Sequence, residues 1–357
     1  MKTPWLASPY QRPSGRAVLL FCALLLAISF IAGSASGAYA ISPLQLVKVV
    51  WDLLTSGFMG PAQHSSEHLV FMNIRLPRLL LGVAAGAALG LSGALMQGLF
   101  RNPLADPGLI GVSSGAALAA GITIVLGSLW FPELPRTLGS WTLVLMAFMG
   151  SLSVTLLVYS LSQQDGSTRV GLMLLAGIAI NALAGAGLGF LTFLASDEQL
   201  RSIQFWLLGS LGGARWSAVA LVSAVVWVAV GAGITLARPL NAMALGEAQA
   251  QLLGVPVERV KRFAVLVTAL AVGAVTATTG MIGFVGLIAP HGVRLVAGPD
   301  HRVVLPGSAL LGAALVLLAD SAARTAVQPA ELPLGVLTAF VGVPFFLLLL
   351  RHFRNRL

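Results

Sequence analysis

The apolar stretch at residues 170–195, VGLMLLAGIAINALAGAGLGFLTFLA, contains no charged side chain and decides the class of fold. A helix rises about 1.5 Å per residue, so about 20 apolar residues are needed to cross the roughly 30 Å of hydrocarbon in a bilayer. Every backbone amide in hydrocarbon must be paired within the protein, which restricts spanning segments to helices and closed barrels. A run of this length without polar alternation predicts a transmembrane helix.

Apolar runs of similar length recur along the whole chain. The composition agrees with them, because 57% of the residues are hydrophobic and 9% are charged, whereas a soluble domain carries about 25% charged residues. No Ser/Pro/Gly linker or change of composition divides the chain. We therefore expect an all-α, polytopic membrane protein in which residues 1–357 form a single transmembrane domain of about ten helices in one bundle. The expected spans are 17–36, 79–99, 110–129, 141–162, 170–195, 216–236, 263–279, 281–297, 303–320 and 334–350.

Lysine and arginine residues set the expected orientation, because they are enriched in cytoplasmic loops. With the N-terminus inside, 14 of the 21 Lys and Arg residues fall on the cytoplasmic side. This bias predicts that both termini are cytoplasmic. It also explains the net charge of +9 without a nucleic-acid partner.

The first apolar run has a second interpretation, as a cleavable secretory signal. Arg16 precedes the run, and residues 38–40, Ala-Tyr-Ala, follow it as a possible cleavage site. Because the run is long for the apolar part of a signal, we expect it to be retained as a span. The single cysteine, Cys22, lies in this run, which excludes an intrachain disulfide and indicates a packing role.

Residues 238–262, RPLNAMALGEAQAQLLGVPVERVKR, form the one long amphipathic interval between apolar runs, on the side expected to be cytoplasmic. Asn241 through Leu253 can form one short helix ended by Gly254, and Pro256 suits the first turn of another. Such a segment suggests a handle by which a protein outside the bilayer moves the helices inside it. A mobile surface helix is the alternative.

Sites of soluble chemistry are scarce. No G-x-x-x-x-G-K-[ST] phosphate loop occurs, so the chain is not expected to bind and hydrolyse a nucleotide in that way. His64 and His68 are four residues apart, but we expect a solvated outer loop there and no metal site. Asp320 is the only acid near a span interior, with Arg324 four residues on, and an ion-coupled transporter usually needs more. We expect no catalytic residues and no enzyme activity in this chain.

Several strings carry a resemblance to a known family. They are RLPR at 75–78, SGALMQG at 92–98, NPLADPGLIGVSSG at 102–115, GFVGLIAPH at 283–291, DHR at 300–302 and AELPLG at 330–335. In this order, and covering nearly the whole chain from about residue 43 onward, they resemble the permease subunits of type II ABC importers for iron chelates, haem and cobalamin.

The resemblance implies a homodimer with ten helices per subunit and a pathway along the subunit interface. It also implies two cytoplasmic ATPase subunits, which would use the ATP, and a periplasmic substrate-binding protein. The chain is then expected in the bacterial inner membrane, without a bound cofactor. Residues 238–262 look like the coupling helices of such permeases, in contact with the ATPase.

Within this coupling segment, the resemblance points to five residues. Gly246 would allow close backbone approach, and Glu247 would pair with a basic group of the ATPase. The five expected coupling residues are Leu245, Gly246, Glu247, Ala248 and Gly254.

Three outer arginines match the positions at which the family meets glutamates of the binding protein, namely Arg75, Arg78 and Arg324. Arginine pairs with carboxylates through a bidentate fork, which favours oriented docking. The alternatives are that Arg75 and Arg78 anchor a span at the headgroups and that Arg324 serves only Asp320.

The pathway is expected, by resemblance, beside the fifth span and the loop after it. This places Asn181, Phe190, Phe193 and residues 196–201 near the passage. Helix-to-helix hydrogen bonding is an equal explanation for Asn181.

The expected cargo is haem, because residues 175–183, 209–212 and 97–102 look most like haem permeases. A ferric siderophore and cobalamin are the alternatives within the same machinery, and an ion-coupled secondary transporter is the alternative from another class. His291 can be imagined as an iron ligand, but its motif fits a structural kink better.

Overall fold

The ten expected spans are all present as helices. The computed structural model describes residues 13–37, 66–130, 137–327 and 330–354, together with residues 45, 51 and 133. His64 and residues 38–40 lie outside these ranges. In chain order the elements are α1 (Gly15–Ala35), α3 (Ser66–Val70), η4 (Phe71–Arg75), α4 (Leu76–Leu99), η5 (Pro107–Ile110), α5 (Val112–Trp130), α7 (Trp141–Leu161), β1 (Gln163–Gln164), β2 (Ser167–Thr168), α8 (Val170–Leu194), α9 (Asp197–Leu208), α10 (Trp216–Thr235), α11 (Ala237–Met243), α12 (Glu247–Leu252), α13 (Val257–Thr279), α14 (Val285–Ala297), α15 (His301–Thr325) and α16 (Leu334–Arg354).

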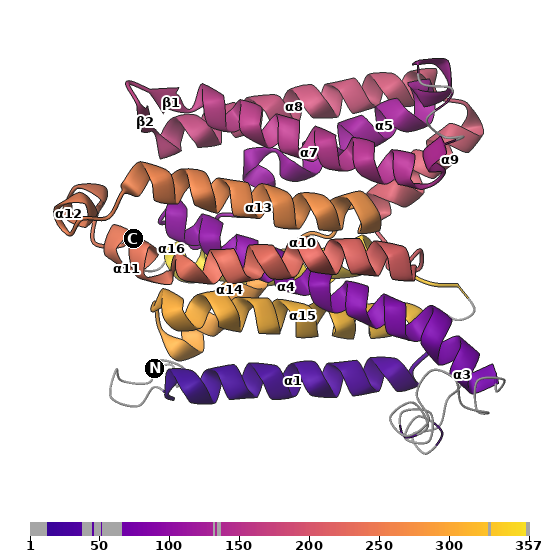
Figure 1. The fold of residues 1–357 in the computed structure, drawn as a ribbon, viewed down its shortest axis with the longest axis horizontal. Coiled ribbons are helices and arrows are strands. Elements are labelled where there is room, and N and C mark those ends of the chain that lie inside the picture. The colour runs from indigo at the N-terminus through magenta and orange to yellow at the C-terminus, as the bar shows by residue number, and fades with distance from the viewer. Residues whose placement is uncertain are drawn as a thin grey trace.

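The long helices lie side by side in one bundle (Figure 1). Within the described residues, seven helices are long and apolar enough to cross a membrane, and the shorter apolar helices α5, α14 and α16 complete the set. The all-α prediction is confirmed, since the only strands described form the two-residue hairpin β1–β2. Several boundaries differ: α13 begins six residues before the expected span, α15 ends five residues after it, and α4 continues an outer helical segment that starts at Ser66.

The two ends of the bundle differ in character. One end carries α11, α12 and the β1–β2 hairpin, and both the start of α1 and the end of α16 lie there too (Figure 1). We call this the α12 end. The opposite end carries α3 and α9, and we call it the α9 end.

Helix α4 forms the centre of the bundle, because 89% of its spanning window is buried and it packs against α10, α13, α14 and α15. Glycines make this packing possible. A Cβ on Gly86 would collide with the backbone of Gly312, and a Cβ on Gly93 would collide with the carbonyl oxygen of Gly286. Small residues let helix backbones approach closely where lipid supplies no hydrophobic drive, and these glycines have that packing role.

The segment between α4 and α5 contains the short helix η5. Arg101 and Gly111 adopt positive φ angles of 49° and 83°, and the chain folds back between them so that η5 lies beside α8. Gly177 of α8 has no room for a side chain because the Leu109 carbonyl oxygen occupies that space. The N-P-L-A-D-P-G string therefore positions η5 against the first half of α8.

Candidate functional site

The coupling segment contains two short helices and not one. Gly246 has φ 123°, a backbone conformation that side chains disfavour, and it separates α11 from α12. The expectation of a single helix from Asn241 to Leu253 is therefore wrong. Gly254 ends α12 as expected, with φ 80° and its amide donating to the Gln251 carbonyl at 2.9 Å. Pro256 directly precedes α13, so the next helix is the membrane span itself and not a second surface helix.

The coupling segment exposes several apolar side chains. Leu245 and Ala248 are exposed, as a docking surface requires, while Ala250 on the other side of α12 is fully buried. The sequence analysis missed Leu252 and Leu253, whose side chains are 89% and 65% exposed. Solvent-exposed leucines grouped at one tip are typical of a protein interaction site.

Glu247 has a partner inside its own chain. Its carboxylate accepts from the Lys261 ammonium at 2.7 Å, so the basic group that we expected from the ATPase is supplied by α13. Lys261 also donates to Glu258 at 3.1 Å and to the backbone carbonyl of Thr168 at 2.8 Å. Glu247 is thus part of an internal polar cluster that joins α12 and α13 to the β1–β2 hairpin.

The three outer arginines are buried and occupied within the chain. Arg78 donates to both carboxylate oxygens of Asp320, at 2.9 to 3.1 Å, and to Glu331 at 3.0 Å. Arg324 pairs with the same Asp320 at 3.1 Å and donates to the carbonyls of Gly33 and Ser36. The predicted pair of Asp320 and Arg324 is therefore confirmed.

Arg75 donates to the backbone carbonyl of Ser34, at the end of α1. Together these contacts make Arg75, Arg78 and Arg324 a buried clasp between α1, α4 and α15. The geometry of the isolated chain thus gives these arginines internal structural contacts, and Arg75 and Arg78 are too buried to act as headgroup anchors. Glu331 is the one carboxylate of the clasp that is about half exposed.

Helix α9 contributes three exposed charges to the α9 end. Ser196 and Gln199 form a capping box at the start of α9, and Gln199 ties the helix to α5 by donating to the Ile124 carbonyl at 3.2 Å. This fixes a short helix that presents Asp197, Glu198 and Arg201 to the outside. Residues 196–201 are thereby held next to the end of α8.

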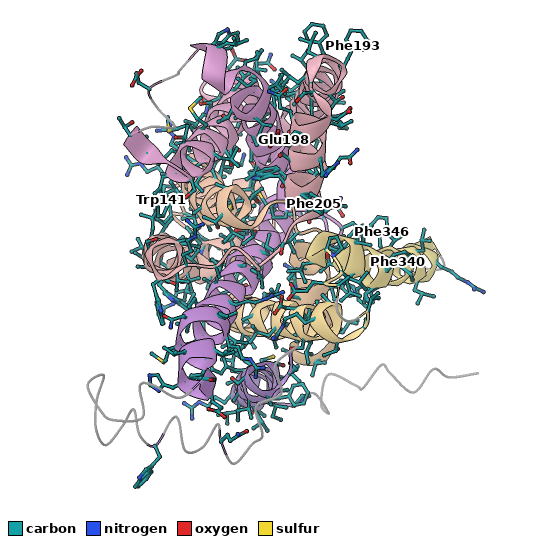
Figure 2. All side chains as sticks on the ribbon, turned by 90° about the vertical axis from the view of Figure 1, so that its right-hand side faces the viewer. Trp141, Phe193, Glu198, Phe205, Phe340 and Phe346 are labelled. Atoms are coloured by element: carbon teal, nitrogen blue, oxygen red, sulfur yellow. The ribbon has the colours of Figure 1, made fainter. Side chains whose placement is uncertain are left out.

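Helix α8 is the least buried long span of the described chain, with only 17% of its window covered. Phe190 and Phe193 are exposed on it, and nothing lies within 4 Å of a Cβ built on Gly185 or Gly189. Figure 2 shows Phe193, Phe205, Phe340 and Phe346 on the same side of the molecule, contributed by α8, α9 and α16. We call this side the α8–α16 face.

Asn181 points away from that open face. Its amide donates to the Gly108 carbonyl at 3.1 Å, and its oxygen accepts from the Ser114 hydroxyl. The alternative explanation, hydrogen bonding between elements, therefore describes Asn181 in this structure. Asn181 also lines a cavity of about 280 Å³ together with Asp106, Ser113 and Gly283.

Comparison with known proteins gives the family. A model of the FecCD transport family matches residues 24–352. The chain belongs to the FecCD transport family. It is 43% identical to the hemin transport system permease protein HmuU of Yersinia pestis over 345 residues, which cover 97% of this chain and 98% of the relative. It is 42% identical to the cobalamin import system permease protein BtuC of Halobacterium salinarum over 305 residues, which cover 84% and 79% of the two chains.

A solved inward-facing structure of a metal-chelate type ABC transporter has the same fold. It matches with a TM-score of 0.79 at 29% identity and covers 95% of this chain and 99% of that chain. The resemblance seen in the short motifs thus extends over the whole FecCD chain. Its relatives are permease subunits, which are transport components and not enzymes.

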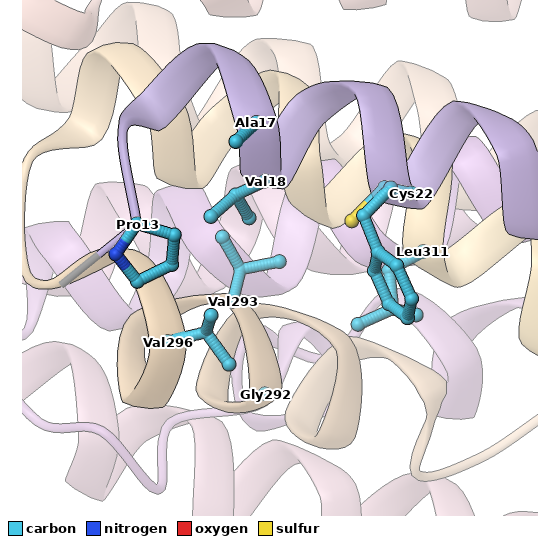
Figure 3. A pocket seen from close by; sticks show the side chains of 9 residues that line it. Pro13, Ala17, Val18, Cys22, Gly292, Val293, Val296 and Leu311 are labelled. Atoms are coloured by element: carbon cyan, nitrogen blue, oxygen red, sulfur yellow. The ribbon is translucent and has the colours of Figure 1, made fainter. Parts of the chain in front are cut away.

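A second cavity of this FecCD permease is apolar. The cavity shown in Figure 3, about 390 Å³, lies between α1 and α14 and is lined by apolar residues such as Val18, Cys22 and Val293. Helix α1 lies at the edge of the bundle opposite α8 (Figure 1). Over the described ranges, no three His, Cys, Asp or Glu side chains gather as a metal site. His291 is buried and packs edge-on against the ring of Phe345, with centroids 6.1 Å apart, as suits a structural role.

Proposed function

We propose that this FecCD permease imports haem from the periplasm to the cytoplasm as a homodimer. Two copies would meet through their α8–α16 faces, and the pathway would run between them. The observation that carries this arrangement is the exposure of α8. Of the long spans in the described chain, α8 has the smallest buried share, 17%, and so leaves the largest surface for a second copy. Its open glycines suit close approach by another helix.

The energy would come from two separate ATPase subunits. The α12 tip presents Leu245, Ala248, Leu252 and Leu253, which fits a hydrophobic groove on a soluble partner. No phosphate loop occurs in the chain, so ATP would be used by the partner and not here. The α12 end would then be cytoplasmic, both termini would lie inside, and the protein would reside in the bacterial inner membrane. A fluorescent protein fused to the C-terminus should therefore fold and fluoresce.

A periplasmic binding protein would deliver the cargo at the α9 end. Docking at Arg75, Arg78 and Arg324, as the resemblance implies, would require a carboxylate of the binding protein to take the place of an internal partner. Glu331 on Arg78 is the accessible one, since it is about half exposed. Contacts between exposed charges weaken with rising salt, so an affinity that does not depend on salt would contradict this docking mode.

Haem is the proposed cargo because of the 43% identity to a hemin permease along 97% of the chain. The similarity to a cobalamin permease, at 42% identity over a shorter part, makes cobalamin the second candidate. The similarity to a metal-chelate transporter supports a ferric siderophore as the third.

The test is uptake into proteoliposomes that contain the permease with its ATPase and are supplied with the binding protein. We expect ATP-dependent accumulation of haem in excess of a ferric siderophore or cobalamin. Vesicles with the permease alone are the control and should accumulate nothing. Uptake that survives without ATP and collapses with a protonophore would show an ion-coupled transporter and overturn the proposal.

A further inference from the structure

Lys261 is a fully buried lysine at the membrane edge of α13. Its side chain is 1% exposed, although Lys261 lies between Val260 and Arg262 in the first two turns of the helix. The ammonium has three N–H donors, and three acceptors surround it: the carboxylates of Glu247 at 2.7 Å and Glu258 at 3.1 Å, and the Thr168 carbonyl at 2.8 Å. Every donor of this buried cation is used.

These acceptors belong to separate elements. Glu247 is the first residue of α12, Glu258 belongs to α13, and Thr168 ends the β1–β2 hairpin. The cluster is closed on its far side, because the Thr168 amide donates to the second oxygen of Glu258 at 2.8 Å. The Thr168 hydroxyl also lies 3.3 Å from the hydroxyl of Tyr159 in α7. One ammonium thus compensates two carboxylates, which would repel each other without it.

Thr168 connects this polar cluster to the start of α8. Helix α8 begins two residues later, at Val170, and the Arg169 amide donates to the Ser162 carbonyl, which closes the base of the hairpin. The hairpin is therefore stiffly connected to the start of α8. On the other side, α12 packs mainly on α11 and α13. The polar link from α12 to α8 passes through the Lys261 ammonium.

We infer that Lys261 is a positioning residue of the transport cycle, which transmits displacement of α12 to the base of α8. This inference rests on the proposed function, in which the ATPase moves α12 and α8 borders the pathway. A hydrogen-bonded ion pair with one partner buried resists separation, because pulling it apart leaves an uncompensated buried charge. When α12 is pushed, Glu247, Lys261 and Thr168 move together.

The test uses the assembled importer with cysteine-free partner subunits and Cys22→Ser in the permease. A nitroxide label is attached either at Gln251, exposed on α12, or at Gln164, exposed in the hairpin. In this background both labels should change their mobility when ATP is added. With Lys261→Met, the response at Gln251 should persist, whereas the response at Gln164 and the haem taken up per ATP should fall by at least about fivefold, the lower end of usual coupling between sites.

Arg169→Met is the matched control. It removes an exposed cation next to Thr168 that has no part in the cluster, so both responses should stay as in the parent. Glu247→Gln tests the same link from its partly exposed end, where a folding defect is not expected. It should reduce the Gln164 response in the same direction as Lys261→Met.

The outcomes separate the two proposals. An unchanged Gln164 response and an unchanged uptake per ATP in Lys261→Met would overturn the inference and leave the proposed function intact. If Lys261→Met does not assemble, an unchanged Glu247→Gln importer overturns it equally. A label at Gln251 that never responds to ATP in the parent would contradict the ATPase contact itself, and the inference with it.

Discussion

Single charged residues in this permease mostly bind within their own chain. Arg78, Arg324 and Lys261 are each buried, and each is neutralised by carboxylates of the same chain. The partner of Arg78, Asp320, is distant in sequence, whereas Arg324 and Lys261 each pair with a carboxylate of their own helix. Burying a charge is costly unless it is paired and hydrogen-bonded, so these clusters specify how the helices fit together. Asp320 compensates the charges of two arginines, Arg78 and Arg324.

Asp320→Asn should destabilise the protein strongly. The change leaves Arg78 and Arg324 buried without their shared counter-charge, and breaking such a pair costs about 3–5 kcal/mol. Glu331→Gln is the control, because Glu331 is about half exposed and a pair of that kind contributes at most about 1 kcal/mol. Unfolding of the detergent-solubilised permease measures both. Equal losses for the two variants would contradict the central role of Asp320.

At the scale of elements, glycine decides where helices touch. Gly93 of α4 lies against the Gly286 carbonyl of α14, and Gly90 lies against the Ser308 carbonyl of α15. In both places main chain meets main chain, so a methyl group has no space. Elsewhere a glycine faces outward, as Gly231 of α10 does, with nothing within 4 Å of an added Cβ.

Gly93→Ala should therefore cost about 3 kcal/mol, the upper end of common overpacking penalties, because α4 and α14 must separate. Gly231→Ala should be neutral or stabilise the helix by up to about 1 kcal/mol, since alanine favours helix and meets no neighbour. Thermal unfolding of the two variants side by side measures this. A Gly93→Ala protein as stable as the parent would show that the α4–α14 contact is looser than described.

Asp300 joins two elements at the α12 end. Its carboxylate caps α15 by accepting from the Arg302 amide at 2.9 Å, and it also accepts from Asn241 of α11. These hydrogen bonds, that from Arg302 foremost, favour the charged form and hold the pKa of Asp300 below its ordinary 3.8. The ionised group thus stabilises the fold above pH 3.8, and this contribution is lost as the pH falls through the lower pKa of the folded state.

Hydrogen exchange of residues 237–243 should accordingly rise in acid on the low side of pH 3.8. Asp300→Asn keeps a capping side chain but cannot titrate, so its exchange should lack this acid-dependent rise. Asp197→Asn, a change of an exposed acid at the other end of the molecule, should behave like the parent. An identical acid response in Asp300→Asn would assign the effect to another group.

On the scale of the whole molecule, one side of the bundle has a large exposed apolar surface. The α8–α16 face presents large apolar side chains such as Leu183 and Phe340, which are 67% and 75% exposed. The opposite edge, formed by α1, also exposes apolar residues, among them Phe21. Lipid suits either surface, but only α8 combines exposure with open glycines along its length.

Replacing Leu183 and Phe340 together by alanine should weaken the dimer. Truncating central apolar anchors of an interface commonly costs 2 kcal/mol or more, so we expect the dissociation constant to rise at least about tenfold. Native mass measurements over a concentration series report it. Phe21→Ala, on the far edge, should leave the dimer unchanged. If Phe21→Ala dissociates the dimer and the double variant does not, the interface lies on α1.

Most of the fold is predictable from sequence because a membrane span is a local property. Each of the ten helices follows from its own apolar run, and the family motifs add order along the chain. The site is less predictable, because its decisive contacts are long-range. Arg78 meets Asp320 across 242 positions, and no pattern in the sequence pairs them.

Lys261 did carry a local signal that the sequence analysis did not use. It falls on the same helical stripe as Val257 and Ala264, both buried, and a lysine on such a stripe has to find acceptors inside the protein. The break at Gly246 had a weaker signal, since a glycine within a short helix is compatible with continuing it. Only the φ angle of the folded chain distinguishes the two.

The glycine contacts between α4, α14 and α15 have one more consequence. A layer of side chains can repack and so absorb a tilt, but peptide groups resting directly on one another leave nothing compressible between them. In the proposed dimer, these three helices would therefore move as one stiff block. In the proposed transport cycle, alternating exposure to the two compartments would then depend on the less buried helices, above all on α8.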